Sequence, residues 1–337
     1  MQAEQLILGQ PLDIIINFTK KIGVKLKPLF IFSLPKAGST LLQRILGASP
    51  YISTATEPWI LLPFIYIFKP NGIRSEYWHK ASVTAIEDFI RDLPEGKKDY
   101  LIELKTFIYN LYKKSSDVNS SYFLDKTPRY SIISHEIMEL FPEGKFIFLW
   151  RNPLAVVSST IQRWYKGKWK IFISYIDFYK GIASLLDTYI SKQADVHALN
   201  FENLLHDPYS EIQQICLYLN IPFTDEMLSA FHKTPLLGRM TEHTGSKVYK
   251  TNISKEPLTN WPSTFNNSYR RLWAKKYLNW IGEDRLKIMG YDYSELLSEL
   301  RSNKNNKINV LASDLTYSSF LKLKSKLFHP LANYPFL

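Results

Sequence analysis

An apolar segment that runs directly into a short glycine-containing loop constrains the fold of this chain more than any other feature. Residues 30–34 form an almost uninterrupted apolar run, which is typical of a parallel β-strand covered on both faces. Pro35 ends this run, and the leucines and isoleucines of residues 41–46 fall on one face of a predicted helix. The first turn of that helix carries Gly38, Ser39 and Thr40, just after Lys36. Because N–H groups at a helix start bind anions, this stretch predicts a phosphate site.

The residue order in this loop differs from that of nucleotide-triphosphate loops. Those loops read G-x-x-x-x-G-K-[ST], whereas here Ser39 follows Gly38 and the lysine, Lys36, precedes the glycine. A nucleotide kinase or hydrolase with a degenerate loop is therefore an alternative interpretation of the segment, and it would require magnesium.

Composition indicates a globular protein with an anionic partner. The chain has 337 residues, of which 45% are hydrophobic, enough to bury a large core in one α/β domain with additions, with two domains as the alternative. Its net charge of +11 favours a nucleotide, a nucleic acid, an acidic substrate or a membrane surface as partner. Charge alone does not choose among them, so a non-catalytic basic protein that binds membrane surfaces is a further alternative.

The cysteine content and the hydropathy bear on where the protein works. Cys216 is the one cysteine, which excludes an intrachain disulfide, and its apolar neighbours predict a buried thiol. No window reaches the roughly 18 apolar residues that a spanning helix needs, and residues 1–18 lack the features of a signal peptide. We therefore expect a cytoplasmic protein without stable membrane insertion.

Strands and helices alternate along most of the chain. Short runs of apolar or β-branched residues predict further strands at residues 50–57, 122–124, 145–150 and 196–201. Apolar periodicity and capping residues predict helices at residues 80–92, 100–114, 132–141, 153–164, 171–191, 208–220 and 269–281. This alternation predicts an α/β fold, a P-loop-like, doubly wound parallel sheet flanked by helices.

The chain is expected to form a single domain with two additions. Residues 1–300 would make up the domain, and residues 60–121 within it would be a helical insertion that covers the sheet and shapes a substrate pocket. Residues 236–265 lose periodicity, which predicts a long loop over the sheet. Residues 301–337 would form a polar linker and a basic C-terminal tail.

Charged residues follow four of the predicted strands. Lys36, Glu57, Lys126 and Arg151 each come directly after a strand, and parallel sheets bind ligands at the carboxyl ends of their strands. We therefore expect three cations and one carboxylate around one crevice. Magnesium-dependent nucleotide hydrolases usually carry an aspartate where Arg151 stands, so a fixed cation there favours a phosphate site without a metal.

Two of these segments resemble the signatures of sulfotransferases. Residues 35–41, Pro-Lys-Ala-Gly-Ser-Thr-Leu, resemble the loop that holds the 5′ end of 3′-phosphoadenosine 5′-phosphosulfate (PAPS). Residues 146–153, followed by Ser159, resemble the second signature, in which an arginine and a serine eight residues later bind the 3′-phosphate. The resemblance implies that PAPS, or its product PAP, is bound by Lys36, Ala37, Gly38, Ser39, Thr40, Arg151 and Ser159.

A finer resemblance, over residues 28–220, is to tyrosylprotein sulfotransferases and the bacterial sulfotransferases like them. It implies that Glu57 removes the proton of the acceptor, that Lys126 is the catalytic lysine, and that Lys36 assists. Pro128 stands where the small-molecule enzymes carry a histidine base, and His243 is the alternative base. The Arg-Lys-Gly segment that covers the 3′-phosphate in the cytosolic enzymes is absent, so we assign that role to Lys250.

The resemblance implies metal-free transfer of a sulfuryl group from PAPS to a hydroxyl or amine. We expect a small-molecule acceptor, because nothing directs the chain to a secretory compartment, and tyrosine sulfation of a peptide or protein is the alternative. No nucleic-acid partner is expected. The seven histidines contain no pair at metal-ligand spacing, which also speaks against a zinc site.

Overall fold

A five-stranded parallel sheet forms the centre of the molecule. The computed structural model describes residues 26–191, 195–236, 253–302 and 314–316. Its strands are β1 Lys27–Phe32, β2 Ile52–Thr54, β3 Tyr122–Asp125, β4 Lys145–Trp150 and β5 Val196–Asn200. They lie in the order β2-β3-β1-β4-β5, and every neighbouring pair is parallel. The predicted α/β fold is confirmed: a doubly wound parallel sheet flanked by helices, with a P-loop-like connection after β1.

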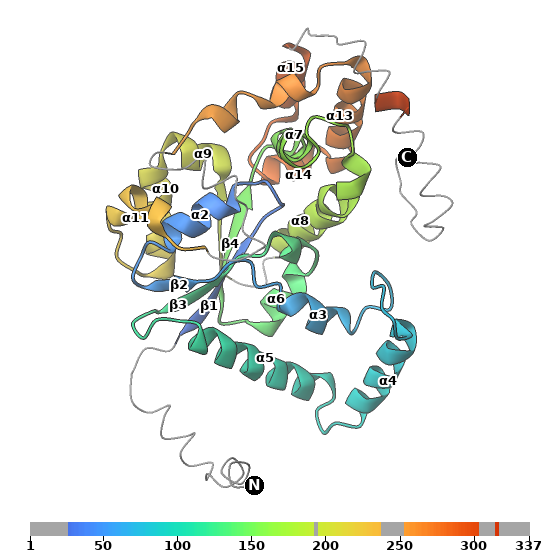
Figure 1. Cartoon of the computed structure of the whole chain (residues 1–337), viewed down its shortest axis with the longest axis vertical. Coiled ribbons are helices and arrows are strands. Elements are labelled where there is room, and N and C mark those ends of the chain that lie inside the picture. The colour runs from blue at the N-terminus through green and yellow to red at the C-terminus, as the bar shows by residue number, and fades with distance from the viewer. Residues whose placement is uncertain (1–25, 192–194, 237–252, 303–313, 317–337) are drawn as a thin grey trace, which may run out of the picture.

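Helices cover both faces of this sheet (Figure 1). They are α2 Ser39–Leu46, α3 Leu61–Tyr66, α4 His79–Arg91, α5 Lys97–Lys114, α6 Ser134–Leu140, α7 Pro153–Trp164, α8 Ile182–Ser191, α9 Phe201–His206, α10 Pro208–Leu219, α11 Glu226–Ser229, α13 Ser268–Ile281, α14 Glu283–Ile288 and α15 Tyr293–Ser302. Short 3₁₀ or π turns are η1 Pro128–Ile132, η2 Ile171–Ser174, η3 Ile176–Gly181, η4 Phe231–Lys233, η5 Glu256–Leu258 and η6 Trp261–Thr264. In Figure 1, α2, α10 and α11 lie on one side of the sheet, and α5 and α6 lie on the other.

The two faces of the sheet bury different kinds of side chain. On β1, Phe30 and Phe32 enter one hydrophobic cluster, and Leu29 and Ile31 enter a second. The strand β4 repeats this alternation. Its aromatic side chains enter the first cluster and its aliphatic side chains the second; they are Phe146, Phe148 and Trp150, and Ile147 and Leu149. The period of two follows from strand geometry, and both sets are buried because helices cover both faces.

Two capping residues begin helices where the sequence predicts them. The Asn152 side chain accepts the N–H groups of Leu154 and Ala155 at 2.9 and 3.3 Å, and α7 begins at Pro153. The Asp207 side chain accepts the N–H of Ser210 at 3.1 Å, at the start of α10. Such caps satisfy N–H groups that have no partner within the helix. The Asn152 cap determines where α7, which lines the site described below, begins after β4.

The structure differs from the sequence prediction in three places. The single helix predicted for residues 171–191 forms as η2, η3 and α8, and the π-helical turn η3 buries Asp177 against Arg129 at 3.3 Å. An ion pair of this kind leaves no trace in apolar periodicity. The helices α3, α9, α11, α14 and α15 were not predicted. The predicted loop over 236–265 contains η5 and η6 in its described part.

Further contacts concern the C-terminal part and the surface. Asp314 pairs with the buried Arg270 at 2.6 Å, and Cys216 is buried, as predicted.

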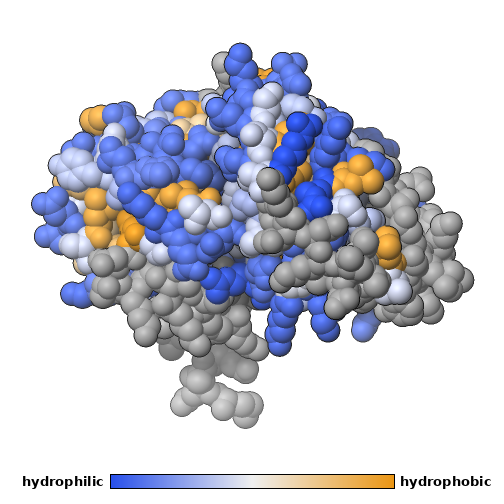
Figure 2. Space-filling model, turned by 90° about the horizontal axis from the view of Figure 1, so that it is seen from above, coloured by the Kyte–Doolittle hydropathy of each residue, from blue (hydrophilic) through white to orange (hydrophobic). Residues whose placement is uncertain are grey.

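Helices α3, α4 and α5 lie within residues 60–121, while the proposed limits of the domain, the insertion and the tail stay predictions. Among the described residues, no helix is long and apolar enough to cross a membrane. The described surface in Figure 2 is mainly hydrophilic, with apolar side chains in limited groups.

Candidate active site

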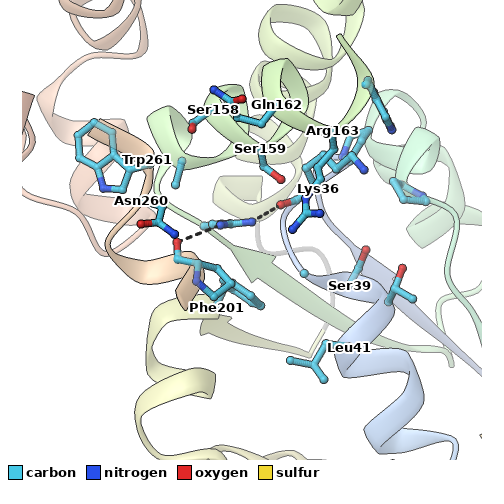
Figure 3. Close-up of a pocket in the computed structure, with 18 of the residues that line it drawn as sticks. Lys36, Ser39, Leu41, Ser158, Ser159, Gln162, Arg163, Phe201, Asn260 and Trp261 are labelled. Carbon is cyan, nitrogen blue, oxygen red and sulfur yellow. Dashed lines mark hydrogen bonds between the residues drawn. The ribbon is translucent and has the colours of Figure 1, made fainter. Parts of the chain in front are cut away.

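A cavity of about 840 Å³ opens at the carboxyl ends of the strands. Such a volume lies within the range of small-molecule and cofactor sites. The sequence-predicted site residues that line it are Lys36, Gly38, Ser39, Thr40, Glu57, Arg151 and Ser159. Figure 3 shows Ser159 and Arg163 of α7 on one side and Lys36 and Ser39 of the loop and α2 on the other. The sheet order explains this convergence, because β1 lies between β3 and β4.

The loop between β1 and α2 has a backbone that few residues other than glycine adopt. Lys36 and Gly38 have φ values of 68° and 99°. A β-carbon at Gly38 would lie 2.2 Å from the Phe201 ring, so the position has neither the conformation nor the room for a side chain. No side chain caps the start of α2. The N–H of Leu41 already donates to the Gly38 carbonyl at 3.0 Å, so the N–H groups of Ser39 and Thr40, which precede it, are those suited to binding an anion in the cavity.

Lys36 and Ala37 have different surroundings within this loop. The Lys36 ammonium lies 4.9 Å from the ring centroid of Trp164, which also lines the cavity. The Ala37 methyl packs in the hydrophobic core, and its N–H donates to the Leu34 carbonyl at 3.2 Å. Ala37 therefore shapes the loop from behind and is not part of the cavity lining.

Arg151 ties three segments together at one end of the cavity. Its guanidinium donates to the Lys36 carbonyl at 2.6 Å and to the Pro257 carbonyl at 3.3 Å, the two dashed lines of Figure 3. It also lies 4.6 Å from the centroid of the Phe201 ring. The side chain is thus held in place, and Ser159 lines the same cavity. A fixed guanidinium and a hydroxyl are suited to binding a phosphate group.

Glu57 and Lys126 form a buried ion pair at the other end. The Lys126 Nζ lies 2.7 Å from Glu57 Oε1 and 3.3 Å from Thr40 Oγ1. The Lys126 side chain is 2% exposed and the Glu57 side chain is 15% exposed. The Trp59 indole donates to Glu57 Oε2 at 3.3 Å. Lys126 lies behind Glu57 and Thr40 rather than in the cavity lining.

Several residues that line the cavity were missed by the sequence reasoning. They are Trp59, Arg129, Gln162, Arg163, Trp164 and Phe201, together with residues from η5 and η6. Arg163 could have been found, because it lies four residues after Ser159 on the same helical face. Burial raises the pKa of Asp177, the ion-pair partner of Arg129, to about 6, while Arg129 lowers it. Lys250 and His243 lie outside the described residues.

The arrangement can bind an anion and transfer a proton. One end presents a helix start, a guanidinium group held by hydrogen bonds and a hydroxyl, and the other presents a carboxylate paired with an ammonium group. Within the described part of the chain, no cluster of three or more His, Cys, Asp or Glu side chains has the geometry of a metal site.

Comparison with known proteins assigns the fold and these segments to one family. Residues 28–225, more than half of the chain, match the family model described as the sulfotransferase family. The chain belongs to the sulfotransferase family. This match spans residues 36–40, Glu57, Lys126, Arg151 and Ser159, and it confirms the resemblance to the sulfotransferase family seen in the sequence.

Curated relatives of this family differ in how much of the chain they share. Nodulation protein NoeE of Sinorhizobium fredii is 29% identical over 142 residues, which are 40% of this chain and 31% of that protein. A putative protein-tyrosine sulfotransferase of Caenorhabditis briggsae is 23% identical over 72% of this chain and 83% of its own length. The chain thus spans less than a third of the first relative and most of the second.

Solved structures were also compared with this chain. The sulfotransferase domain from the Synechococcus PCC 7002 olefin synthase superposes with a TM-score of 0.47 and 21% identity, over 71% of this chain and 88% of that domain.

Proposed function

We propose that this protein transfers a sulfuryl group from PAPS to a hydroxyl group of an acceptor. The observation that carries the proposal is the position of Lys126, whose ammonium contacts both the Glu57 carboxylate and the Thr40 hydroxyl, at 2.7 and 3.3 Å. One cation thus connects a candidate general base to the phosphate loop. A sulfuryl group transferred between a phosphate and a hydroxyl would pass between these two groups.

The described residues fit the two ends of PAPS. The uncapped start of α2 and the Lys36 ammonium would hold the 5′-phosphosulfate, because Gly38 leaves the backbone open to an anion. Arg151 and Ser159 would hold the 3′-phosphate, and Lys250 would cover it. When bound, PAPS supplies an activated sulfuryl group with a phosphate as leaving group. The fixed cations would balance the negative charge that a magnesium ion balances in nucleotide hydrolases.

Glu57 and Lys126 would divide the chemistry between them. Glu57 takes the proton of the acceptor hydroxyl while that oxygen bonds to sulfur and the bond from sulfur to the phosphate oxygen breaks. Lys126 stabilises the charge that develops on the departing phosphate oxygen, with help from Lys36. A protonated Glu57 no longer neutralises Lys126, so the ammonium charge becomes available to the departing group when that charge appears.

The cavity volume and the relatives bear on the class of acceptor. A cavity of about 840 Å³ must hold the nucleotide and the acceptor together, which favours a small-molecule hydroxyl as the first candidate. Relatives named protein-tyrosine sulfotransferase that match more than two thirds of this chain favour the tyrosine of a peptide as the second. Both candidates are hydroxyl acceptors, and both can be sulfated by the chemistry described above.

One experiment tests donor and acceptor together. The protein is incubated with PAPS in EDTA and with four probes, namely tyramine, 4-nitrophenol, a primary alcohol and a tyrosine-containing peptide, and each probe is weighed by mass spectrometry. We expect the mass gain of one sulfuryl group on at least one probe, and binding of PAP in EDTA by calorimetry. Binding of ATP in place of PAP, with a requirement for magnesium, would instead support the nucleotide kinase alternative.

A further inference from the structure

A fully buried carboxylate directly precedes Lys126 in the chain. Asp125 is the last residue of β3, is 0% exposed, and does not line the cavity. Its Oδ2 accepts hydrogen bonds from the hydroxyls of Tyr112 and Tyr130, at 2.6 and 3.1 Å, and its Oδ1 accepts one from Thr127 at 3.3 Å. A buried carboxylate requires such partners. The proposed chemistry gives Asp125 no direct role. Its hydrogen bonds therefore indicate a role outside the reaction itself.

Two of these hydroxyls continue to the segment that carries Glu57. Thr127 Oγ1, which donates to Asp125, accepts the N–H of Trp59 at 3.3 Å. The Tyr130 hydroxyl, which also donates to Asp125, accepts the N–H of Leu61 at 3.2 Å. Residues 55–60 belong to no helix or strand, so contacts with neighbouring elements determine their position. The first relay therefore connects residues 55–60 to Asp125, the residue next to Lys126, and the second connects the first residue of α3, which directly follows them, to the same carboxylate.

The third hydroxyl, that of Tyr112, donates to the same oxygen of Asp125 as Tyr130 does. Tyr112 lies on α5, is 3% exposed, and stacks on Phe123 with ring centroids 4.3 Å apart. Because Phe123 belongs to β3, the same tyrosine holds both the strand and its terminal carboxylate. Burial raises the pKa of Asp125 to about 6, against the lowering effect of its hydroxyl donors and Lys126. In the structure the two carboxylate oxygens accept all three hydrogen bonds.

We infer that Asp125 is a positioning residue that holds Glu57 against Lys126 through the two relays, Thr127 to Trp59 and Tyr130 to Leu61. The inference rests on the proposed function in taking Glu57 and Lys126 as the proton-transfer pair. Lys126 follows Asp125 in the chain, and Trp59 reaches Glu57 through its indole at 3.3 Å. One buried carboxylate thus determines the relative position of the two side chains, although it touches neither substrate.

Hydrogen exchange tests the relays without depending on activity. The amide protons of Trp59 and Leu61 are the two that the relays bind, and a peptic fragment covering residues 57–62 reports both. We expect faster exchange in this fragment for Asp125→Asn and for Thr127→Val, which keeps the shape and removes the hydroxyl. Thr127→Ser, which keeps the hydroxyl, should exchange like the parent. Tyr109→Phe on the same helix as Tyr112 is the matched control, because its hydroxyl binds Glu143 instead.

Kinetics test the consequence for proton transfer. Asp125→Asn should lower kcat for tyramine by roughly 10- to 100-fold, the cost of displacing a catalytic group by about an ångström, while PAP affinity stays at the parental value. The loss should be much smaller for 4-nitrophenol, which is partly ionised at neutral pH and needs a base less. A merely structural role would lower kcat equally for both phenols.

Three results would overturn the inference or separate it from the proposed function. Unchanged exchange in both Asp125→Asn and Thr127→Val would show that the carboxylate does not hold the segment. Equal loss for both phenols, or a parallel loss of PAP affinity, would replace positioning by general destabilisation. If the parent sulfates none of the four probes, the proposed function fails, and exchange still decides whether Asp125 holds residues 57–62. If Asp125→Asn does not fold, exchange in the Thr127 variants decides. Faster exchange of residues 57–62 in Thr127→Val than in Thr127→Ser supports the inference, and equal exchange overturns it.

Discussion

The two ends of the cavity are constructed in different ways. The phosphate end uses the backbone of one continuous segment, residues 36–40, with Arg151 fixed on the Lys36 carbonyl at 2.6 Å. The proton-transfer end uses side chains from separate segments, Glu57 and Lys126, whose backbones are tied together through Asp125. A backbone site tolerates the loss of one side chain, because the helix N–H groups remain. A site made of side chains loses its function when one reacting atom is replaced.

The largest effect should follow from removing the base. Glu57→Gln keeps the shape of the side chain and removes its ability to accept a proton, so kcat for tyramine should fall by roughly 10²- to 10⁴-fold. PAP affinity, measured by calorimetry, should stay at the parental value, since the phosphate end does not use Glu57. Activity of Glu57→Gln near that of the parent with tyramine would place the base elsewhere, and His243→Ala would then be the next variant.

The buried carboxylate of Asp125 should make the free energy of unfolding depend on pH. The pKa of Asp125 is raised by burial from 3.8 to about 6, so the folded protein favours the protonated form. The stability from this group is complete below about pH 4 and is lost as pH rises through about 6, by up to about 3 kcal/mol. Urea unfolding at several pH values should show that decline in the parent but a smaller one in Asp125→Asn. Parallel curves for both would contradict the shift.

The phosphate end should respond to Arg151→Ala with a loss of affinity. A hydrogen bond to a charged group contributes about 1.5–3 kcal/mol, so PAP should bind roughly 10- to 100-fold more weakly. Adenosine 5′-phosphosulfate, which has no 3′-phosphate, should lose much less, and calorimetry with both ligands measures the difference. Equal losses for the two ligands would move Arg151 away from the 3′-phosphate.

Ser159→Ala should give the smallest effect, because one hydroxyl contributes about 0.5–1.5 kcal/mol. PAP affinity should fall by a factor of about 2 to 10, again with little change for adenosine 5′-phosphosulfate. Thr160→Ala is the matched control on α7, because the Thr160 hydroxyl binds the Val156 carbonyl within the helix and lies outside the cavity lining. An equal loss of PAP affinity in both variants would indicate a change in the helix rather than in a ligand contact.

Most of the fold could be predicted from local patterns. The predicted strand at residues 145–150 and the helix at 153–164 match β4 and α7, because continuous apolar runs and capping residues act over a few neighbouring positions. The break of residues 171–191 into three segments could not be predicted, since it accompanies the burial of Asp177 against Arg129, which lies far away in the sequence.

The sequence by itself determined the class of fold and the glycine-containing turn between β1 and α2. The conformation of residues 36–40 depends on local residue types, above all on glycine at a position with φ of 99°, and local types can be read along the chain. It also determined which charged residues follow the strands.

Only the tertiary structure decided how these residues meet. It paired Lys126 with Glu57 across 69 positions of sequence, left Lys126 behind the cavity lining, turned the Ala37 methyl into the core, and brought Trp59, Arg129 and Phe201 to the cavity. It also joined Asp125 to Tyr112 and, through Thr127 and Tyr130, to Trp59 and Leu61. The physical reason is that a hydrogen bond depends on distance and direction in space, and sheet order, helix packing and burial determine these only when the whole chain has folded.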